Sequence, residues 1–214
     1  MAFLLIISAP GYLLVRGASG AFENIDSVGL VDTATGTWHM SDSAGDISSF
    51  YYGDAGDVPL VGDWNCDGID TVGVYRPRSG VVFLRNSNTP GIADFVYALG
   101  NPGDIPLAGD FNGDCYDTVS LYRPSEARFY ILNQLRTGGR GVGAADFSFE
   151  FGDMGDVPFV GDFDGDQIHE VAVHRPTSGL IYYRETLTAG QAHKNFEFGV
   201  DGDVFVAGDW NKDG

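Results

Sequence analysis

The chain has 214 residues, with 30 Asp and Glu against 12 Lys and Arg, which gives a formal net charge of −18. A surface this acidic repels phosphate backbones and anionic lipid headgroups, and no basic patch interrupts it, so the composition excludes a nucleic-acid or membrane-surface role. Hydrophobic residues make up 43% of the chain, which is too many for a disordered acidic tail. Its 31 glycines and 9 prolines, with few helix-favouring runs, favour many short strands joined by turns.

The N-terminal segment, residues 1–21, is the first predicted element. Met1 to Val15 has the apolar core of a secretory signal peptide, but it lacks the usual basic residues before that core, and Pro10 and Gly11 interrupt it. It is also shorter than the roughly 20 apolar residues of a transmembrane helix, so we predict no membrane span. We favour an apolar strand or hairpin that is buried against this chain or a neighbouring one.

Residues 22–214 form a predicted repeat domain. Segments that begin at Gly56, Gly103 and Gly155 align without a gap, and Gly202 begins a further copy, so that the starts are 47, 52 and 47 residues apart. The five extra residues lie in the glycine-rich stretch 136–144, which we interpret as a longer hairpin loop. The predicted units are about 22–62, 63–109, 110–161 and 162–208, followed by the start of a loop at 209–214.

Each unit carries about four strand signals, which are clearest at Val58–Val61, Thr71–Tyr75, Val81–Arg85 and Asp94–Leu99. These runs are rich in Val, Tyr and Phe and are bounded by turn residues. About 47 residues with four antiparallel strands is the size of a propeller blade. We therefore predict an all-β, β-propeller-like array of about four four-stranded blades. A β-solenoid or a sandwich built from the same repeats is the alternative. The period leaves open the number of blades and the closure of the ring. It also leaves open whether Met1 is the true start and whether the chain continues beyond Gly214.

The predicted chemistry lies in a loop of each unit that repeats Asp-x-Asn/Asp-x-Asp. Alternate acidic residues in a tight turn bring several oxygens to one centre, which suits Ca²⁺ with its about 6 to 8 oxygen ligands. Without a cation these carboxylates repel one another, and the four loops hold 12 of the 30 acidic residues. The alternative is that Asp, Asn and Gly only cap the turns. The predicted calcium ligands are Asp63, Asn65, Asp67, Asp70, Asp110, Asn112, Asp114, Asp117, Asp162, Asp164, Asp166, Glu170, Asp209, Asn211 and Asp213.

Some loop residues depart from the repeat. Cys66, Cys115 and Gln167 stand where glycines are expected, and His169 stands where the first two loops have Asp, departures that weaken individual sites, the second and fourth most. We favour two isolated thiols for the cysteines, with a disulfide between neighbouring blades as the alternative; their spacing matches no zinc pattern.

The sequence from Gly161 to Asp166, GDFDGD, is followed by an apolar strand from Glu170 to Val173 and by Arg175-Pro176. It resembles the FG-GAP or VCBS-type repeats, calcium-loop blades found in the integrin alpha-subunit head and in many bacterial secreted and surface proteins. The resemblance covers about residues 26–214. It implies a β-propeller with calcium at the matching loops, and it implies no catalytic mechanism, because the family is chiefly structural and adhesive.

Other recurring side chains have a choice of roles. Each loop is followed by an Arg-Pro pair. Its guanidinium either pairs with a loop carboxylate or with the Asp of the Gly-Asp-x-Pro turns, which would tie one blade to the next, or it is solvated; the residues are Arg76, Arg123 and Arg175, and Asp57, Asp104 and Asp156. The aromatic residues Tyr51, Tyr52 and Trp64 either stack on sugars or pack in the core. The four histidines, of which His174 has a strand position, form no metal pattern.

We find no nucleophile elbow, phosphate loop or His-x-x-x-His pair, so we expect no enzyme. The predicted function is a calcium-stabilised structural or adhesive module, secreted by a bacterium or held at its cell surface. One alternative is a subunit of a self-assembling extracellular filament that uses its N-terminal strand to contact other copies of itself. Another is a carbohydrate-binding module, so the expected partners are other protein chains and glycans.

Overall fold

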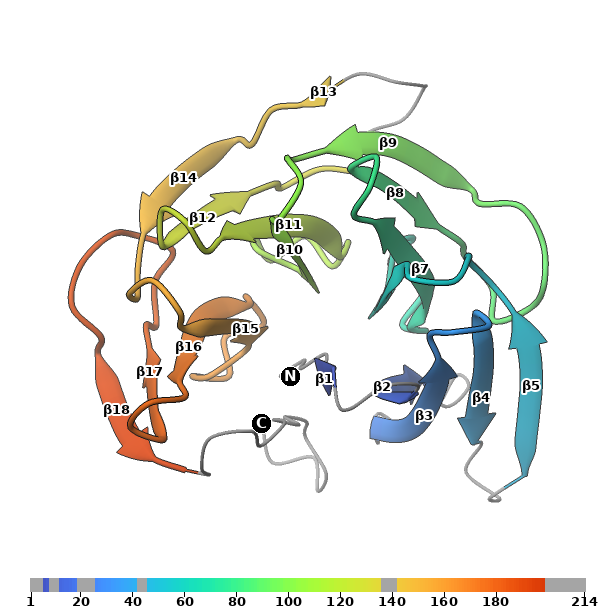
Figure 1. The fold of residues 1–214 in the computed structure, drawn as a ribbon, viewed down its shortest axis with the longest axis horizontal. Coiled ribbons are helices and arrows are strands. Elements are labelled where there is room, and N and C mark those ends of the chain that lie inside the picture. Colours follow the sequence, from blue (N-terminus) through green and yellow to red (C-terminus); the bar gives the residue numbers. More distant parts are fainter. Residues whose placement is uncertain (1–5, 8–11, 19–25, 42–45, 136–141, 199–214) are drawn as a thin grey trace.

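The computed structural model describes residues 6–7, 12–18, 26–41, 46–135 and 142–198. Within these ranges the chain forms strands and turns and no helix. The strands make four small sheets, and Figure 1 shows these sheets around a common centre as a four-bladed β-propeller. The predicted fold class is confirmed, and the solenoid and sandwich alternatives do not apply.

The strands of each sheet follow the order of the chain, with one exception. The first sheet contains β1 (Ile6–Ile7), β2 (Tyr12–Ala18), β3 (Asp26–Asp32), β4 (Thr37–Ser41) and β5 (Ile47–Tyr51). The second contains β6 (Val58–Gly62), β7 (Thr71–Arg76), β8 (Val81–Leu84), β9 (Phe95–Leu99) and, out of order, β13 (Val142–Gly143). The third contains β10 (Ile105–Gly109), β11 (Thr118–Arg123), β12 (Arg128–Ile131) and β14 (Phe147–Glu150). The fourth contains β15 (Val157–Gly161), β16 (Glu170–Arg175), β17 (Leu180–Tyr183) and β18 (Lys194–Glu197).

The N-terminal segment supplies two strands of the first sheet. β1 and β2 form an antiparallel hairpin, and β2 pairs along its full length with β3 from Tyr12 opposite Asp32 to Ala18 opposite Asp26. Because β3 corresponds to β7 in the repeat, β2 holds the place that β6, β10 and β15 hold in the other sheets. The predicted hairpin is thus paired within this chain.

The predicted units and the sheets differ in phase by one strand. The units were counted from one acidic loop to the next, so that a boundary falls after Gly62, at the end of β6. In the structure β6 pairs with β7, the strand on the other side of that boundary, from Val58 opposite Tyr75 to Gly62 opposite Thr71. A repeat has no intrinsic starting point, and only the backbone hydrogen bonds decide which strands share a sheet.

The core lies mainly between successive sheets. The strands next to the inner ones are buried over most of their length, as in β7 and β11, whereas β8 and β12 alternate between buried and partly buried residues. One cluster joins Leu60 and Tyr75 of the second sheet to Val119 and Leu121 of the third. Another joins the third sheet to the fourth through buried Phe129. Burial of these apolar surfaces holds neighbouring blades together.

The longer connection of the third blade is more than a hairpin loop. Its described end forms β13, which leaves the third sheet and pairs in parallel with β9 of the second, with Val142 opposite Ala98 and Gly143 opposite Leu99. Figure 1 shows β13 alongside the outer strand β9. The insertion therefore joins two blades.

The aromatic residues offered for sugar stacking mostly belong to the core. Trp64 is 0% exposed and Tyr52 is 6% exposed, so the stacking alternative is wrong for both, while Tyr51 is 66% exposed.

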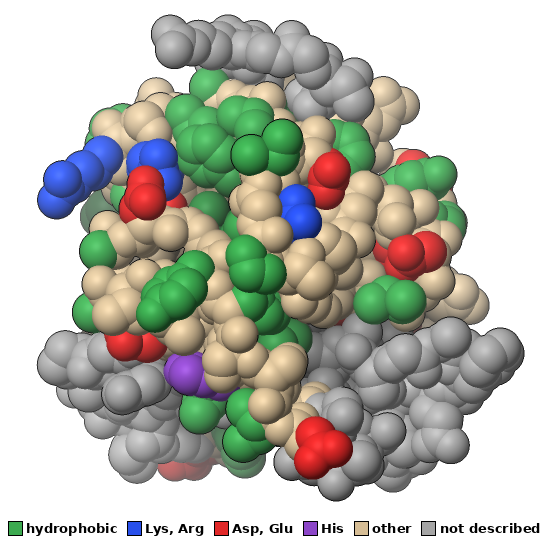
Figure 2. Space-filling model, turned by 90° about the vertical axis from the view of Figure 1, so that its right-hand side faces the viewer, with side chains coloured by type: hydrophobic (Ala, Val, Ile, Leu, Met, Phe, Trp, Pro, Cys, Tyr) green, Lys and Arg blue, Asp and Glu red, His purple; other side chains and the backbone are tan. Residues whose placement is uncertain are grey.

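Figure 2, viewed from the side of β5, shows acidic side chains scattered over that face. The described part of the chain contains no helix that could cross a lipid bilayer.

Candidate metal centre and loop face

The acidic loops join the innermost strand of a sheet to its neighbour. In the second, third and fourth sheets they span residues 63–70, 110–117 and 162–169 and lie at the same end of the strands. The first aspartate of each loop organises the turn: Asp63 accepts hydrogen bonds from the backbone N–H groups of Asn65, Asp67 and Gly68. Asp110 and Asp162 accept equivalent bonds. These bonds are the turn-capping role that the alternative interpretation assigned to aspartate.

Two positions in each loop have a positive φ, which is unusual for a residue with a side chain. The first position is Cys66 in the first of these loops, at φ 59°, and glycine in the other two. The second position is glycine in the first of these loops, Cys115 in the next, at φ 71°, and Gln167 in the last, at φ 72°. The sequence interpretation of these residues as replacements for glycine is therefore confirmed. Each one holds a left-handed conformation that glycine adopts without strain.

A disulfide bond joins Cys66 of the first of these loops to Cys115 of the next, with 5.2 Å between their Cα atoms. The preference for two isolated thiols is wrong, and the alternative of a bond between neighbouring blades is confirmed. The physical reason is that the two positions belong to adjacent blades whose loops lie side by side, at a separation within the normal range for a disulfide. The bond closes a covalent link between the second and third blades.

Hydrogen bonds repeat this contact between blades. The Asp117 N–H donates to the carbonyl oxygen of Asp63 at 2.9 Å, and the Asp117 carboxylate accepts from the Asp63 N–H at 2.8 Å. One blade further on, the His169 N–H donates to the Asp110 carbonyl at 2.6 Å, and Nδ1 of His169 accepts from the Asp110 N–H at 3.1 Å. His169 thus replaces a carboxylate by keeping Nδ1 as an acceptor, which places the proton of the neutral ring on Nε2.

Close packing at this end of the blades explains the glycines that end β6 and β10. A Cβ atom at Gly62 would lie 2.7 Å from the ring of Trp64 and 2.9 Å from the carboxylate of Asp117, and one at Gly109 would lie 2.8 Å from the ring of His169. The Asp117 carboxyl has its pKa raised well above the usual value, mainly by burial and then by the neighbouring charge of Asp70. Both aspartates are buried at the blade interface, and Asp117 is directed at a neighbouring loop.

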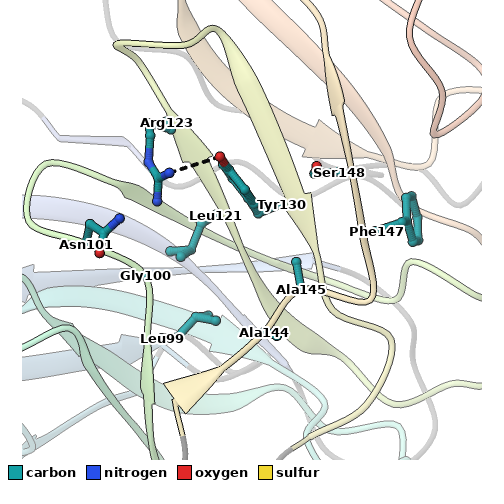
Figure 3. Close-up of a pocket in the computed structure, with 10 residues that line it drawn as sticks. All are labelled: Leu99, Gly100, Asn101, Leu121, Arg123, Tyr130, Ala144, Ala145, Phe147 and Ser148. Carbon is teal, nitrogen blue, oxygen red and sulfur yellow. Dashed lines mark hydrogen bonds between the residues drawn. The ribbon is translucent and has the colours of Figure 1, made fainter.

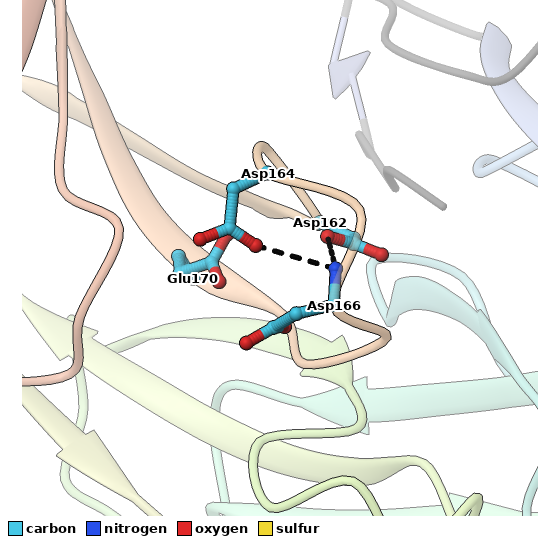
Figure 4. Close-up of side chains that lie close together, drawn as sticks. All are labelled: Asp162, Asp164, Asp166 and Glu170. Carbon is cyan, nitrogen blue, oxygen red and sulfur yellow. Dashed lines mark hydrogen bonds between the residues drawn. The ribbon is translucent and has the colours of Figure 1, made fainter. Parts of the chain in front are cut away.

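Among the described residues, one group of carboxylates converges closely enough to bind a metal ion. Asp162, Asp164, Asp166 and Glu170 each offer a ligand atom within 4.8 Å of the others, and Figure 4 shows them around a common point. Glu170 comes from the start of β16 and its side chain accepts a hydrogen bond from the Phe163 N–H at 2.9 Å. Burial, with the charges of the three aspartates, raises the pKa of Glu170 to about 7.

In each of the first two loops an asparagine amide stabilises one of the loop carboxylates by a hydrogen bond. The side-chain amide of Asn65 donates to Asp67 at 3.0 Å, and that of Asn112 donates to Asp114 at 3.0 Å. The third loop has Asp164 at this position, whose carboxylate side chain has no N–H to donate, and it has Glu170 where the others have Thr71 and Thr118. Hard oxygen ligands with excess negative charge suit Ca²⁺, so the third loop has the donor set that fits this ion best.

The remaining predicted ligands stand as follows. The structure brings Asp63, Asn65 and Asp67, and likewise Asp110, Asn112 and Asp114, into hydrogen-bonded turns. Asp70 and Asp117 lie at the blade interface, while Asp209, Asn211 and Asp213 lie outside the described residues. The contact that Asp117 and His169 make with the preceding blade was missed in the sequence analysis. The one available signal was that a polar residue recurs directly before the second strand of each blade, at Asp70, Asp117 and His169.

The Arg-Pro arginines have the second of the three predicted roles. Arg76, Arg123 and Arg175 form ion pairs with Asp57, Asp104 and Asp156 respectively, each with a nitrogen–oxygen distance of 2.8 Å. Each pair joins the start of an inner strand to the end of its neighbour in the same sheet, so the prediction that it ties one blade to the next is wrong. These pairs lie at the opposite end of the strands from the acidic loops.

Comparison with known proteins gives no relative for this chain: no protein-family model, no curated protein and no solved structure matches it.

Proposed function

We propose that this chain is a secreted or cell-surface structural module, of the FG-GAP or VCBS type, that is stabilised by calcium and acts in adhesion or scaffolding. The observation that carries the proposal is the convergence of four carboxylates in the third loop, with ligand atoms within 4.8 Å. Asp162, Asp164, Asp166 and Glu170 would hold the ion, and the ion would remove their mutual repulsion.

The disulfide supports the location. Disulfides persist in secreted and surface proteins, whereas thiols in the cytosol are kept reduced. Cys66 and Cys115 are bonded to each other, and no free cysteine is left in the chain. Free calcium outside cells is also high enough to fill sites with dissociation constants of about 10⁻⁴ to 10⁻³ M.

Calcium removal tests the proposal through thermal stability. A ligand that binds only the folded state at 100 times its dissociation constant adds about 2.7 kcal/mol to the free energy of unfolding. We therefore expect calorimetry to show a Tm roughly 5–11 °C higher in saturating calcium than in excess chelator, at about 2–4 °C per kcal/mol.

The variant Asp164→Asn sharpens this test, because it gives the third loop the residue found in the first two. It should remove most of the calcium-dependent shift in Tm. The control is Asp114→Asn, the same exchange in the second loop at the position that corresponds to Asp166, where Asp114 accepts a hydrogen bond from Asn112; it should leave the shift unchanged. The proposal would be contradicted if the Tm were the same in calcium and in chelator, or if the calcium-dependent rise in Tm were as large in Asp164→Asn as in the original protein.

The raised pKa of Glu170 predicts a pH dependence whose sign reverses with calcium. In chelator the folded state holds the Glu170 proton more tightly than the unfolded state, so stability falls as pH rises from the ordinary pKa of about 4.3 toward about 7. With calcium the ion displaces that proton, so affinity should fall as pH drops below about 7. Calcium titrations by calorimetry between pH 5 and 8 measure this, and a pH-independent affinity would count against Glu170 as a ligand.

A further inference from the structure

The inner strand of the first sheet departs from the repeat. In the other three sheets the inner strand leads through an acidic loop into its neighbour, but the residues between β2 and β3 contain no Asp-x-Asn/Asp-x-Asp sequence. Arg16 of β2 lies opposite Val28, a register position at which the other inner strands have buried apolar residues; these are Val61, Ala108 and Val160. The sequence of β2 is therefore a poor match for its place.

Residues 202–214 carry the sequence that the first sheet lacks. GDVFVAGDWNKDG matches GDVPLVGDWNCDG, the segment from Gly56 to Gly68 that contains β6 and its acidic turn. Six residues, 198–203, separate β18 from Val204, as six residues separate β5 from β6 and β14 from β15. A connection of this length leads from one blade to the next, and Figure 1 shows the first and fourth sheets as neighbours around the centre. The connection thus allows residues 204–208 to reach β3.

Leu30 of β3 is exposed at a position that is buried in the other blades. Its side chain is 41% exposed, whereas the corresponding side chains are at most 3% exposed; they are Val74, Leu121 and Val173. This position faces the preceding blade. Figure 3 shows Leu121 beside Leu99 and Gly100 of the second blade, where these residues line a cavity of about 390 Å³. Leu30 therefore marks a face of the first blade that is directed at the fourth.

Phe196 of β18 is the counterpart of Leu30 on the fourth blade. It is 47% exposed, whereas the corresponding side chains are at most 6% exposed; they are Phe50, Tyr97 and Phe149. This position faces the following blade, since Tyr97 shares a core cluster with Leu121 and Phe149 shares one with Val173. The blade that follows the fourth around the ring is the first. Both faces of this interface are thus less covered than their equivalents in the described part of the chain.

The size of Trp210 matches a glycine of β3. In the second blade a Cβ atom at Gly73 would lie 3.1 Å from the ring of Trp64. Blades with a smaller ring in the loop have a larger residue at the position of Gly73, and the combinations are Phe111 with Ser120 and Phe163 with Ala172. At this position β3 has Gly29, opposite Met40 as Gly73 is opposite Leu84. Trp210 therefore fits the first blade as Trp64 fits the second.

We propose that the edge of β3 is a docking site for residues 204–208 of the same chain, which displace β2 and seat the first blade against the fourth. Pairing in the register of β6 with β7 places Gly208 opposite Ser27 and Val204 opposite Val31, the places that Gly17 and Leu13 hold in β2. One strand edge pairs with one strand, so β2 and residues 204–208 exclude each other. Docking buries Leu30 and Phe196 and releases the apolar N-terminal segment.

This inference goes beyond the proposed function and does not depend on it. Backbone pairing and apolar packing carry the docking, whereas calcium would bind in the third loop. The protein could therefore exchange its inner strand with or without a bound ion, and failure of one proposal leaves the other standing.

An engineered disulfide tests the docking. The native bond joins the fourth position of one acidic loop to the sixth position of the next, and the same two positions at the boundary of the first and second blades are Lys212 and Gly68. The pair Lys212→Cys and Gly68→Cys is made in the Cys66→Ser, Cys115→Ser background. We expect a bond within one chain, with an effective concentration in glutathione buffer well above the roughly millimolar value of a flexible tether. Mass spectrometry of unreduced peptides identifies it.

The control pairs Lys212→Cys with Ser79→Cys, an exposed position in the turn at the other end of the second blade. It should reach no more than the value of a flexible tether. Gly29→Ala should lower the effective concentration between positions 68 and 212 about fivefold or more, because its Cβ atom crowds Trp210. Adding Trp210→Phe should restore it, since the fourth blade makes this combination with Phe163 and Ala172.

Hydrogen exchange reports the release of β2. Val206→Asp places a charge at the position of buried Leu60, so it blocks docking and leaves β2 paired with β3. The amides of β2 should exchange at least about tenfold faster in the bonded protein than in this variant. The proposal is overturned if positions 68 and 212 bond no more readily than positions 79 and 212, if the bond joins two chains, if Trp210→Phe fails to reverse Gly29→Ala, or if the amides of β2 stay protected in the bonded protein.

Discussion

Replacing Cys66 and Cys115 together by serine is expected to lower the free energy of unfolding by roughly 2–4 kcal/mol. The bond joins residues 49 positions apart, so in the unfolded chain it closes a long loop and reduces the conformational freedom that unfolding releases. Serine keeps a side chain at the two positive-φ positions, so backbone strain there is retained and the difference reports the cross-link. Urea denaturation of both proteins measures the effect.

Reducing agent provides the control for this prediction. Treatment with a thiol reductant should destabilise the original protein to the level of the double variant and leave the variant itself unchanged. Hydrogen bonds between Asp117 and Asp63 remain after the bond is cut, so we expect a weakened interface between blades and not a different fold. An original protein whose reduced form, verified by mass spectrometry, unfolds at the same urea concentration would contradict the prediction.

The second large effect is expected at an ion pair in the fourth blade. Arg175 contacts two carboxylates, Asp156 at 2.8 Å and Asp153 at 2.5 Å, whose side chains are 2% and 72% exposed. Asp156→Asn leaves a partly buried guanidinium without its buried charge partner. We expect it to lower the free energy of unfolding by roughly 2–4 kcal/mol, somewhat less than for a fully buried pair.

Asp153→Asn is the matched comparison, because it alters the other carboxylate on the same guanidinium. Water already solvates Asp153, so its loss should lower the free energy of unfolding by less than about 1 kcal/mol. Urea denaturation of the two single variants compares the loss of the buried partner with the loss of the exposed one. Equal effects on the free energy of unfolding would contradict the prediction, because they would show that the burial of Asp156 does not strengthen its ion pair.

Much of the fold could be predicted because the repeat reports local chemistry. Turn residues and β-branched runs specify short strands without reference to the rest of the chain, and their recurrence from Gly56 to Gly155 specified the size of a blade. The pairing of Arg123 with Asp104 was among the predicted alternatives, since both residues recur with the repeat. The carboxylates of the third loop converge as expected, because Asp162, Asp164 and Asp166 alternate within one turn and Glu170 begins the strand that follows it.

Contacts between blades could not be read from the sequence in this way. The bond between Cys66 and Cys115 was only an alternative, since the sequence does not show that one loop lies beside the next. The cross-blade contact of Asp117 was hidden because an aspartate beside a metal-type loop is equally well explained as a ligand. The pairing of β13 with β9 was missed because a glycine-rich insertion predicts a loop.

The sequence by itself determined the strands, the acidic turns and the repeat unit of this protein, because hydrogen bonds within a turn and alternation along a strand depend on near neighbours in the chain. The tertiary structure alone decided which loops touch, where a cross-link forms between blades and where a cavity opens beside β9. Those features depend on the angle and distance between packed sheets, which arise from side-chain packing across the whole interface and have no fixed separation in sequence.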